Sequence, residues 1–182
     1  MASSGFSLLL LSLSLSLSLS LVCAKGNTDL IQKTCQSTNY NDLCVSSFES
    51  DPDSFAADAP GLALIIIEMG INSSLNTSSY ASNLLRNATN PLLTKVLKQC
   101  LDCYTNAHTA LHRSLDSLAS PDTYDYAYLH VSAAMEYPGI CHDVFKHNAR
   151  FVYPLEMGLG EEALQHICDI ALGIISVLLS ET

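Results

Sequence analysis

Apolar side chains recur at intervals of three and four residues over three long stretches of the chain, and this spacing places them on one face of an α-helix. The clearest stretch runs from Pro91 to Ala119 and is long enough for about eight helical turns. The same spacing recurs from Tyr124 to Phe145 and from Leu164 to Leu178. Each apolar face must be buried against another helix, which predicts an all-α fold.

A fourth helix is expected between Asp58 and Ala88. Asp58 can accept a hydrogen bond from the first turn, and Pro60 suits a first turn because the missing N–H has no helical partner there. The stretch from Leu62 to Ile67 is apolar on every side. At least two neighbouring helices must therefore cover it.

Short joints separate the predicted helices at Asn90-Pro91 and at Ser120-Pro121-Asp122. Proline and the polar residues beside it favour a break in the helix, and a brief connection makes consecutive helices antiparallel. The sequence therefore predicts an up-and-down four-helix bundle over residues 57–182.

An α-helical hairpin is expected before the bundle, in residues 25–56. Two short helices, at 29–38 and 42–50, are too short to be stable alone in water. A disulfide between Cys35 and Cys44 would join the two arms, and closing this loop contributes about 2.7 kcal/mol on a chain-entropy estimate.

Residues 1–24 have the character of a secretory signal peptide. They contain no charged side chain, and a Leu/Ser run from Leu8 to Leu21 ends in a segment suited to signal peptidase. A membrane anchor is the alternative, but serine interrupts the run at every second position from Ser12 onward, unlike a stable spanning helix. We expect secretion, no membrane association after cleavage, and one domain in residues 25–182.

Removal of the signal peptide leaves six of the seven cysteines, an even number that suggests three disulfides in an oxidising compartment. Besides Cys35–Cys44, Cys100 on the second bundle helix can meet Cys141 on the third, in a loop that contributes about 3.9 kcal/mol by the same estimate. Cys103 and Cys168 would form the third pair. This pairing is a hypothesis.

Cys100-Leu101-Asp102-Cys103 also has the C-x-x-C spacing of redox and zinc sites, and His166 with Cys168 could complete a set of four ligands. In a secreted protein, structural disulfides are the favoured interpretation. His108 and His112 have the spacing of a helical zinc pair, but no Glu follows the first His. We therefore assign no metal and no cofactor.

The charge balance narrows the classes of partner. Lys and Arg total 8 against 18 Asp and Glu, for a net charge of -10, and no basic stripe is available for a phosphate backbone. Nucleic acid is excluded as a partner, and a basic protein is a better candidate.

The sequence has no motif for catalysis. The chain has no G-x-S-x-G elbow, and Glu161-Glu162 are expected at the start of the last helix, where they complement its dipole. The sequence predicts a binding module with no catalytic residue.

Three N-glycosylation sequons lie close together in the latter half of the first bundle helix or at its exit. They begin at Asn72, Asn76 and Asn87. Glycans on these residues would keep that face and end of the bundle from serving as the partner surface.

Several short motifs, in this order, resemble the plant invertase and pectin methylesterase inhibitor family over essentially the whole mature chain. They are Ile31-Gln32-Lys33-Thr34-Cys35, Asn41-Asp42-Leu43-Cys44, Ser50-Asp51-Pro52, Gly61-Leu62-Ala63-Leu64, Leu97-Lys98-Gln99-Cys100 and Val131-Ser132-Ala133-Ala134-Met135. The resemblance implies a disulfide-closed helical hairpin beside a four-helix bundle, with Cys35–Cys44 and Cys100–Cys141 as the two bridges of the family. Cys103 and Cys168 lie outside that pattern.

The resemblance also implies a function. Such proteins are secreted inhibitors of plant cell-wall carbohydrate enzymes, located in the apoplast with the vacuole as the alternative, and they block a substrate cleft by 1:1 binding. Pectin methylesterase is the slightly preferred target, because an acidic inhibitor suits a basic enzyme. Acid invertase (β-fructofuranosidase) is the alternative. A secreted lipid-binding or signalling protein is the rival from another class.

The joint between the second and third bundle helices is the expected contact with the target enzyme. Invertase inhibitors of this type place a Pro-Lys-Phe motif there, whereas this chain has Asp122 after the proline. An acidic side chain should be repelled by active-site carboxylates. The expected contact residues are Pro121, Asp122, Thr123, Tyr124 and Tyr128.

Overall fold

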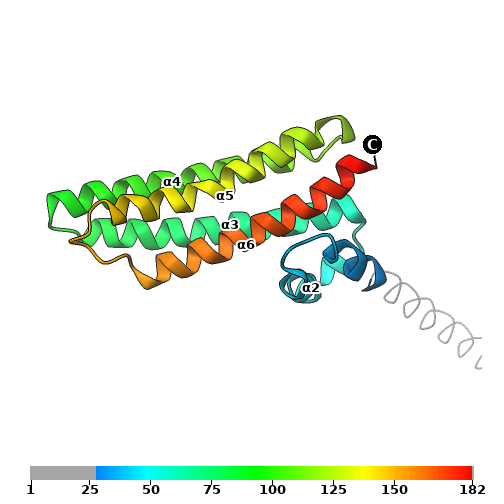
Figure 1. Cartoon of the computed structure of the whole chain (residues 1–182), viewed down its shortest axis with the longest axis horizontal. Coiled ribbons are helices and arrows are strands. Elements are labelled where there is room, and N and C mark those ends of the chain that lie inside the picture. The colour runs from blue at the N-terminus through cyan, green and yellow to red at the C-terminus, as the bar shows by residue number, and fades with distance from the viewer. Residues whose placement is uncertain (1–27, 182) are drawn as a thin grey trace, which may run out of the picture.

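The computed structural model describes residues 28–181, which contain helices and loops and no β-strand (Figure 1). The predicted signal peptide, residues 1–24, lies outside the described residues. Residues 28–35 are helical, and the following elements are α2 (Asn41–Glu49), the short 3-10 helix η1 (Pro52–Phe55), α3 (Ala59–Asn87), α4 (Pro91–Ser117), the 3-10 helix η2 (Pro121–Thr123), α5 (Tyr124–Lys146) and α6 (Leu155–Ser180).

Helices α3 to α6 form the predicted up-and-down four-helix bundle. Each helix packs against the one that follows it in the chain, and α6 closes the bundle by packing against α3. The α4–α5 joint lies at the same end as the C-terminus, whereas the α3–α4 and α5–α6 joints lie at the opposite end (Figure 1). This topology confirms the all-α prediction and separates two sets of loops by the length of the bundle.

Side-chain caps set where two of the bundle helices begin. Asp58 accepts a hydrogen bond from the Gly61 N–H at 2.9 Å at the start of α3. Asn90 accepts from the N–H groups of Leu92 and Leu93, at 2.9 and 3.3 Å, at the start of α4. These oxygens pair with N–H groups that have no carbonyl partner inside the helix.

Large apolar side chains from all four helices meet in one core that excludes water. Helix α6 is apolar enough and long enough to cross a membrane by composition alone, with a mean hydropathy of 1.7 over its most apolar window. Eight residues of this helix, however, are buried in the core of the bundle. The buried residues of α6 are Met157, Leu164, Cys168, Ile170, Ala171, Ile174, Ile175 and Leu178.

The N-terminal hairpin docks on α6 through a close backbone approach. A Cβ atom at Gly173 would lie 3.0 Å from the Ser37 carbonyl oxygen, so only a glycine admits the hairpin at this distance. Asn39 donates its amide to both carboxylate oxygens of Asp169 at 3.0 Å. The ring centroids of Tyr40 and His166 lie 4.1 Å apart. The hairpin is thereby fixed to the side of the bundle.

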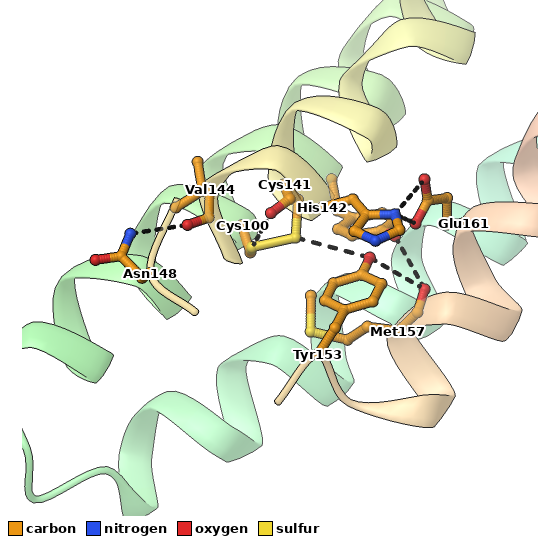
Figure 2. The surroundings of a disulfide bond; sticks show 9 residues. Cys100, Cys141, His142, Val144, Asn148, Tyr153, Met157 and Glu161 are labelled. Atoms are coloured by element: carbon orange, nitrogen blue, oxygen red, sulfur yellow. Dashed lines mark hydrogen bonds and ion pairs between the residues drawn. A yellow bond between two sulfur atoms is a disulfide. The ribbon is translucent and has the colours of Figure 1, made fainter. Parts of the chain in front are cut away.

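Two of the three predicted disulfides are present. Cys35–Cys44 closes the hairpin with a Cα–Cα distance of 5.6 Å, and Cys100–Cys141 joins α4 to α5 at 4.6 Å (Figure 2). Both values lie within the usual range for disulfides.

The third predicted bridge, Cys103–Cys168, is wrong for this structure, because both residues are buried free thiols. Cys103 lies on α4 and Cys168 on α6, which are diagonally opposite in the bundle. Diagonal helix axes are about 11–14 Å apart when adjacent axes are 8–10 Å apart, so even Cα atoms on their inner sides are about 6–9 Å apart. Most of this range exceeds the roughly 7 Å that a disulfide can span.

A cluster around Tyr153 fastens the α5–α6 joint to the bundle (Figure 2). The Tyr153 ring stacks on His142 with a centroid distance of 4.5 Å and meets Phe145 edge-on at 5.2 Å. The Tyr153 hydroxyl donates to the Met157 carbonyl oxygen at 3.5 Å. Glu161 was expected at the start of α6, but α6 begins at Leu155, so Glu161 lies beyond the first turn. There it pairs with His142.

Candidate functional site

The α4–α5 joint is a compact, exposed turn held by its own hydrogen bonds. The Thr123 hydroxyl donates to the carbonyl oxygens of Ser117 and Ser120, at 2.7 and 2.9 Å, so the 3-10 turn η2 is tied back to the end of α4. Pro121 and Asp122 point their side chains into solvent at its tip. A turn ordered before binding reduces the entropy that a partner must remove.

The five predicted contact residues do not all reach the surface. Pro121 and Asp122 are exposed, Thr123 is half-buried, and Tyr128 is half-buried against the core. Tyr124 is a correction to the prediction, because only 6% of it is exposed and it belongs to the core. It falls on the same apolar stripe as Val131, which directs it between the helices.

Exposed apolar side chains on α5 extend the candidate site along the bundle. Tyr126 is 56% exposed, Leu129 is 60% exposed and Ile140 is 50% exposed. Their spacing places all three on one face of the helix, away from the core stripe. Sequence reasoning missed them because it followed the buried stripe, although the same helical period identifies the opposite face.

The joint and α5 carry a strongly acidic character. No Lys or Arg occurs between Arg113 and Lys146, whereas this stretch contains Asp116, Asp122, Asp125, Glu136 and Asp143. Apolar contacts with an acidic rim suit a partner surface that is apolar at its centre and basic around it. We call Pro121, Asp122, Tyr126 and Leu129 the joint surface.

The cysteines and histidines that have metal or redox spacing lie on α4 and α6, and Cys100 is part of a disulfide. Burial, and then the nearby Asp102 carboxylate, raise the pKa of the Cys103 thiol, which disfavours the thiolate that redox chemistry needs. The rings of His108 and His112 are 4.6 Å apart, and burial followed by the charge of His112 lowers the pKa of His108. Within residues 28–181, no group of three or more His, Cys, Asp or Glu side chains could hold a metal ion.

The three sequon asparagines are exposed on α3. Asn72 and Asn76 lie within the helix, and Asn87 is its last residue. All three are accessible on the described surface, and their glycosylation stays a prediction.

The fold and the joint surface define a class of protein: a disulfide-braced helical bundle with an exposed, acidic and partly apolar face at one joint. A family model described as plant invertase/pectin methylesterase inhibitor matches residues 29–174. The chain therefore belongs to the plant invertase/pectin methylesterase inhibitor family, whose members inhibit one or the other enzyme.

Individual relatives carry names from both branches of this family. The chain is 39% identical to cell wall/vacuolar inhibitor of fructosidase 2 from Arabidopsis thaliana, over 98% of this chain and 99% of the relative. It is 36% identical to pectinesterase inhibitor 28 from Oryza sativa subsp. japonica, over 83% and 70% of the two chains. It is 31% identical to a pectinesterase inhibitor from Actinidia deliciosa, over 94% and 91%.

A solved structure shares the fold. The crystal structure of a mutant form of a pectin methylesterase inhibitor from Arabidopsis superposes with a TM-score of 0.65, covering 78% of this chain and 92% of that one at 22% identity. This likeness supports the helical bundle as the common architecture.

Proposed function

We propose that this protein inhibits an acid invertase by covering the substrate cleft of the enzyme in a 1:1 complex. The main support is the 39% identity to the fructosidase inhibitor, which extends over nearly the full length of both chains. This choice reverses the order of targets that charge alone favoured in the sequence. Sequence identity over the full length compares every position of the two chains, whereas net charge is a single property of one chain.

Pectin methylesterase is the second candidate target. The net charge of -10 and the acidic stretch from Asp116 to Asp143 suit a basic enzyme. The rice and kiwifruit relatives, at 36% and 31% identity, are named for pectinesterase. These observations support pectin methylesterase as a target whose substrate cleft would be covered in the same way.

The joint surface is the part of the bundle that we propose enters the cleft. Tyr126 and Leu129 would bury apolar area along α5, while Asp122, at the tip of the turn, would face the reaction centre of the enzyme. The chain has no lysine at this joint, so the contact would depend on the α5 face more than on an inserted basic side chain.

The protein would act by occupation, without catalysis, in the compartment where its target works. The predicted signal peptide directs the chain into the secretory pathway, which leads to the cell wall or the vacuole. The two disulfides match an oxidising environment.

Titration of the mature chain, from Lys25, against purified acid invertase and purified pectin methylesterase tests the proposal. We expect saturable loss of invertase activity, with an end point at one inhibitor per enzyme under tight-binding conditions. Inhibition of pectin methylesterase alone would select the second candidate. Full activity of both enzymes at micromolar inhibitor would refute the function.

A further inference from the structure

An open cavity of about 400 Å³ lies at the end of the bundle opposite the joint surface. Four segments line it with apolar side chains: Leu84 from α3, Leu93 from α4, Phe145 from α5, and Val152 with its neighbours from the α5–α6 joint. The polar side chains in its lining are those of Asn87 and Arg150. We call this hollow the end cavity.

The end cavity exposes apolar surface to water. Val152 is 89% exposed, and Phe151 beside it is only partly covered. Apolar side chains gathered around an open hollow are a common mark of a binding site. A group attached nearby could cover this surface.

Asn87 offers an attachment point for such a group. It is the last residue of α3, it begins the sequon Asn87-Ala88-Thr89, and its side chain lines the cavity. The chain leaves the helix at Ala88 with an extended backbone, so the sequon lies in an exposed turn. The amide Nδ2 has two hydrogens, and one of them donates to the Asn83 carbonyl oxygen at 2.9 Å. The linkage to a sugar would replace one of these two hydrogens.

We propose that an N-glycan linked to Asn87 folds back into the end cavity and covers its apolar floor. The linkage forms between Nδ2 and the anomeric carbon of N-acetylglucosamine, which is transferred from a lipid-linked pyrophosphate donor. The amide loses one proton and the lipid pyrophosphate leaves, so no oxidant or reductant is needed. The first sugars then lie against Phe151 and Val152, whose apolar groups contact the C–H face of a pyranose ring.

Arg150 supplies the polar part of the same site. Arg150 lines the cavity. A guanidinium is a planar group with several N–H donors, which suit the acetamido oxygen and the hydroxyls of the sugar. A cavity with an apolar floor and a few polar groups at its edge is the usual design for binding a small organic ligand. Here the ligand is covalently tethered, so its local concentration is high.

The other two sequons on α3 provide an internal contrast. Asn72 and Asn76 are exposed but do not line the end cavity. Glycans attached to them would extend from the helix into solvent. The proposal therefore predicts that the three glycans differ in their effect on the fold.

The test uses the full chain secreted from a eukaryotic host, with glycan occupancy measured by peptide mass spectrometry. Thr89→Ala removes the Asn87 sequon and keeps the asparagine, whereas Thr89→Ser keeps the sequon. Ser78→Ala removes the Asn76 sequon as a second control. We expect Thr89→Ala to lower Tm by about 3 °C and to increase the binding of a hydrophobic dye about twofold, because apolar surface is uncovered.

Thr89→Ser and Ser78→Ala should both match the unaltered protein in Tm and dye binding. Absence of a glycan from Asn87 in the secreted protein would overturn the proposal. It would equally be overturned if Thr89→Ala lost the glycan yet matched Thr89→Ser in both measurements. Neither readout depends on inhibition, so the result is independent of the target enzyme.

Discussion

The Nδ1 atom of His142 on α5 lies 3.1 Å from a carboxylate oxygen of Glu161 on α6, and the same imidazole stacks on Tyr153. The pair is partly shielded, since the Glu161 side chain is only 13% exposed. It joins the two helices next to the Cys100–Cys141 disulfide, as Figure 2 shows. The disulfide joins α5 to α4, and this contact joins α5 to α6, so together they connect three helices of the bundle.

Replacing Glu161 should destabilise the bundle in a graded way. Glu161→Ala leaves the His142 ring nitrogen without its partner and should lower the free energy of unfolding by about 1–2 kcal/mol. Glu161→Gln keeps a carbonyl oxygen that can accept from Nδ1–H and should lose less. Urea denaturation measures both. The exposed neighbour Glu162 is the control, and a Glu161→Ala variant as stable as Glu162→Ala would contradict the assigned role.

The stability of the protein should fall at alkaline pH in part because of Cys168. Burial raises the pKa of its thiol to about 12, from an ordinary value of 9.0. Below pH 9 the thiol is protonated in both the folded and unfolded states. Above pH 9 only the unfolded state ionises, so the free energy of unfolding decreases by up to about 1.4 kcal/mol per pH unit.

Denaturation curves between pH 7 and about pH 10.5 check this linkage, with Cys168→Ala as the comparison. The buried hydroxyls of Tyr104 and Tyr153 also have a raised pKa, caused first by burial, and they act in the same direction in both proteins. The difference between the two curves therefore isolates the thiol. Parallel curves would show that Cys168 ionises equally well in the folded state.

Gly160 should tolerate no side chain, because α6 and α3 touch there. A Cβ atom at Gly160 would meet Thr77, with its methyl carbon at 2.9 Å. Gly160→Ala should lower the free energy of unfolding by about 1–3 kcal/mol. Gly139→Ala is the matched control, since a Cβ there meets nothing within 4 Å and should stabilise α5 by about 0.5–1 kcal/mol. Thermal denaturation measures both, with a lower Tm expected for Gly160→Ala and a higher Tm for Gly139→Ala.

Leu129 should be needed for inhibition and not for folding. Its side chain is 60% exposed at the centre of the joint surface, so Leu129→Asp should reduce inhibition at least tenfold and leave Tm unchanged. Leu75, 50% exposed on the sequon-bearing helix α3, is the control, and Leu75→Asp should inhibit normally. Equal inhibition by both variants would remove the α5 face from the interface.

Asp122 should limit inhibition of an acid invertase. Glycosidases usually place two carboxylates at the reaction centre, and an exposed aspartate at the tip of the joint opposes them. Asp122→Lys should strengthen inhibition about tenfold, whereas Asp122→Asn should give an intermediate effect. Inhibition constants measured at two salt concentrations test the electrostatic origin. An unchanged constant for the lysine variant would place the tip outside the cleft.

The helices and their order could be predicted from the sequence because local rules determine them. The apolar period identified the three long stretches, and the predicted cap at Asp58 is the observed start of α3. The Asn90-Pro91 break likewise coincides with the start of α4. These features depend on residues a few positions apart, which a single sequence contains in full.

The predictions that were wrong depend on which helices are neighbours in three dimensions. The spacing of Cys100 and Cys103 indicates nearby helix positions but does not say that α6, with Cys168, lies on the diagonal. Tyr124 was expected at the contact and is buried, while Tyr126 was overlooked and is exposed. An aromatic residue suits either environment, so its type alone cannot distinguish a core position from a contact.

The Cys100–Cys141 disulfide encloses the exposed joint, because its two cysteines lie on either side of residues 118–123. A protease that cuts the main chain in this turn would leave both fragments on one covalent molecule, still paired as α4 and α5. A nicked inhibitor would then keep its helices in place instead of separating into two pieces. In any compartment that contains proteases, the bridge would therefore preserve the paired helices after a cut in this turn.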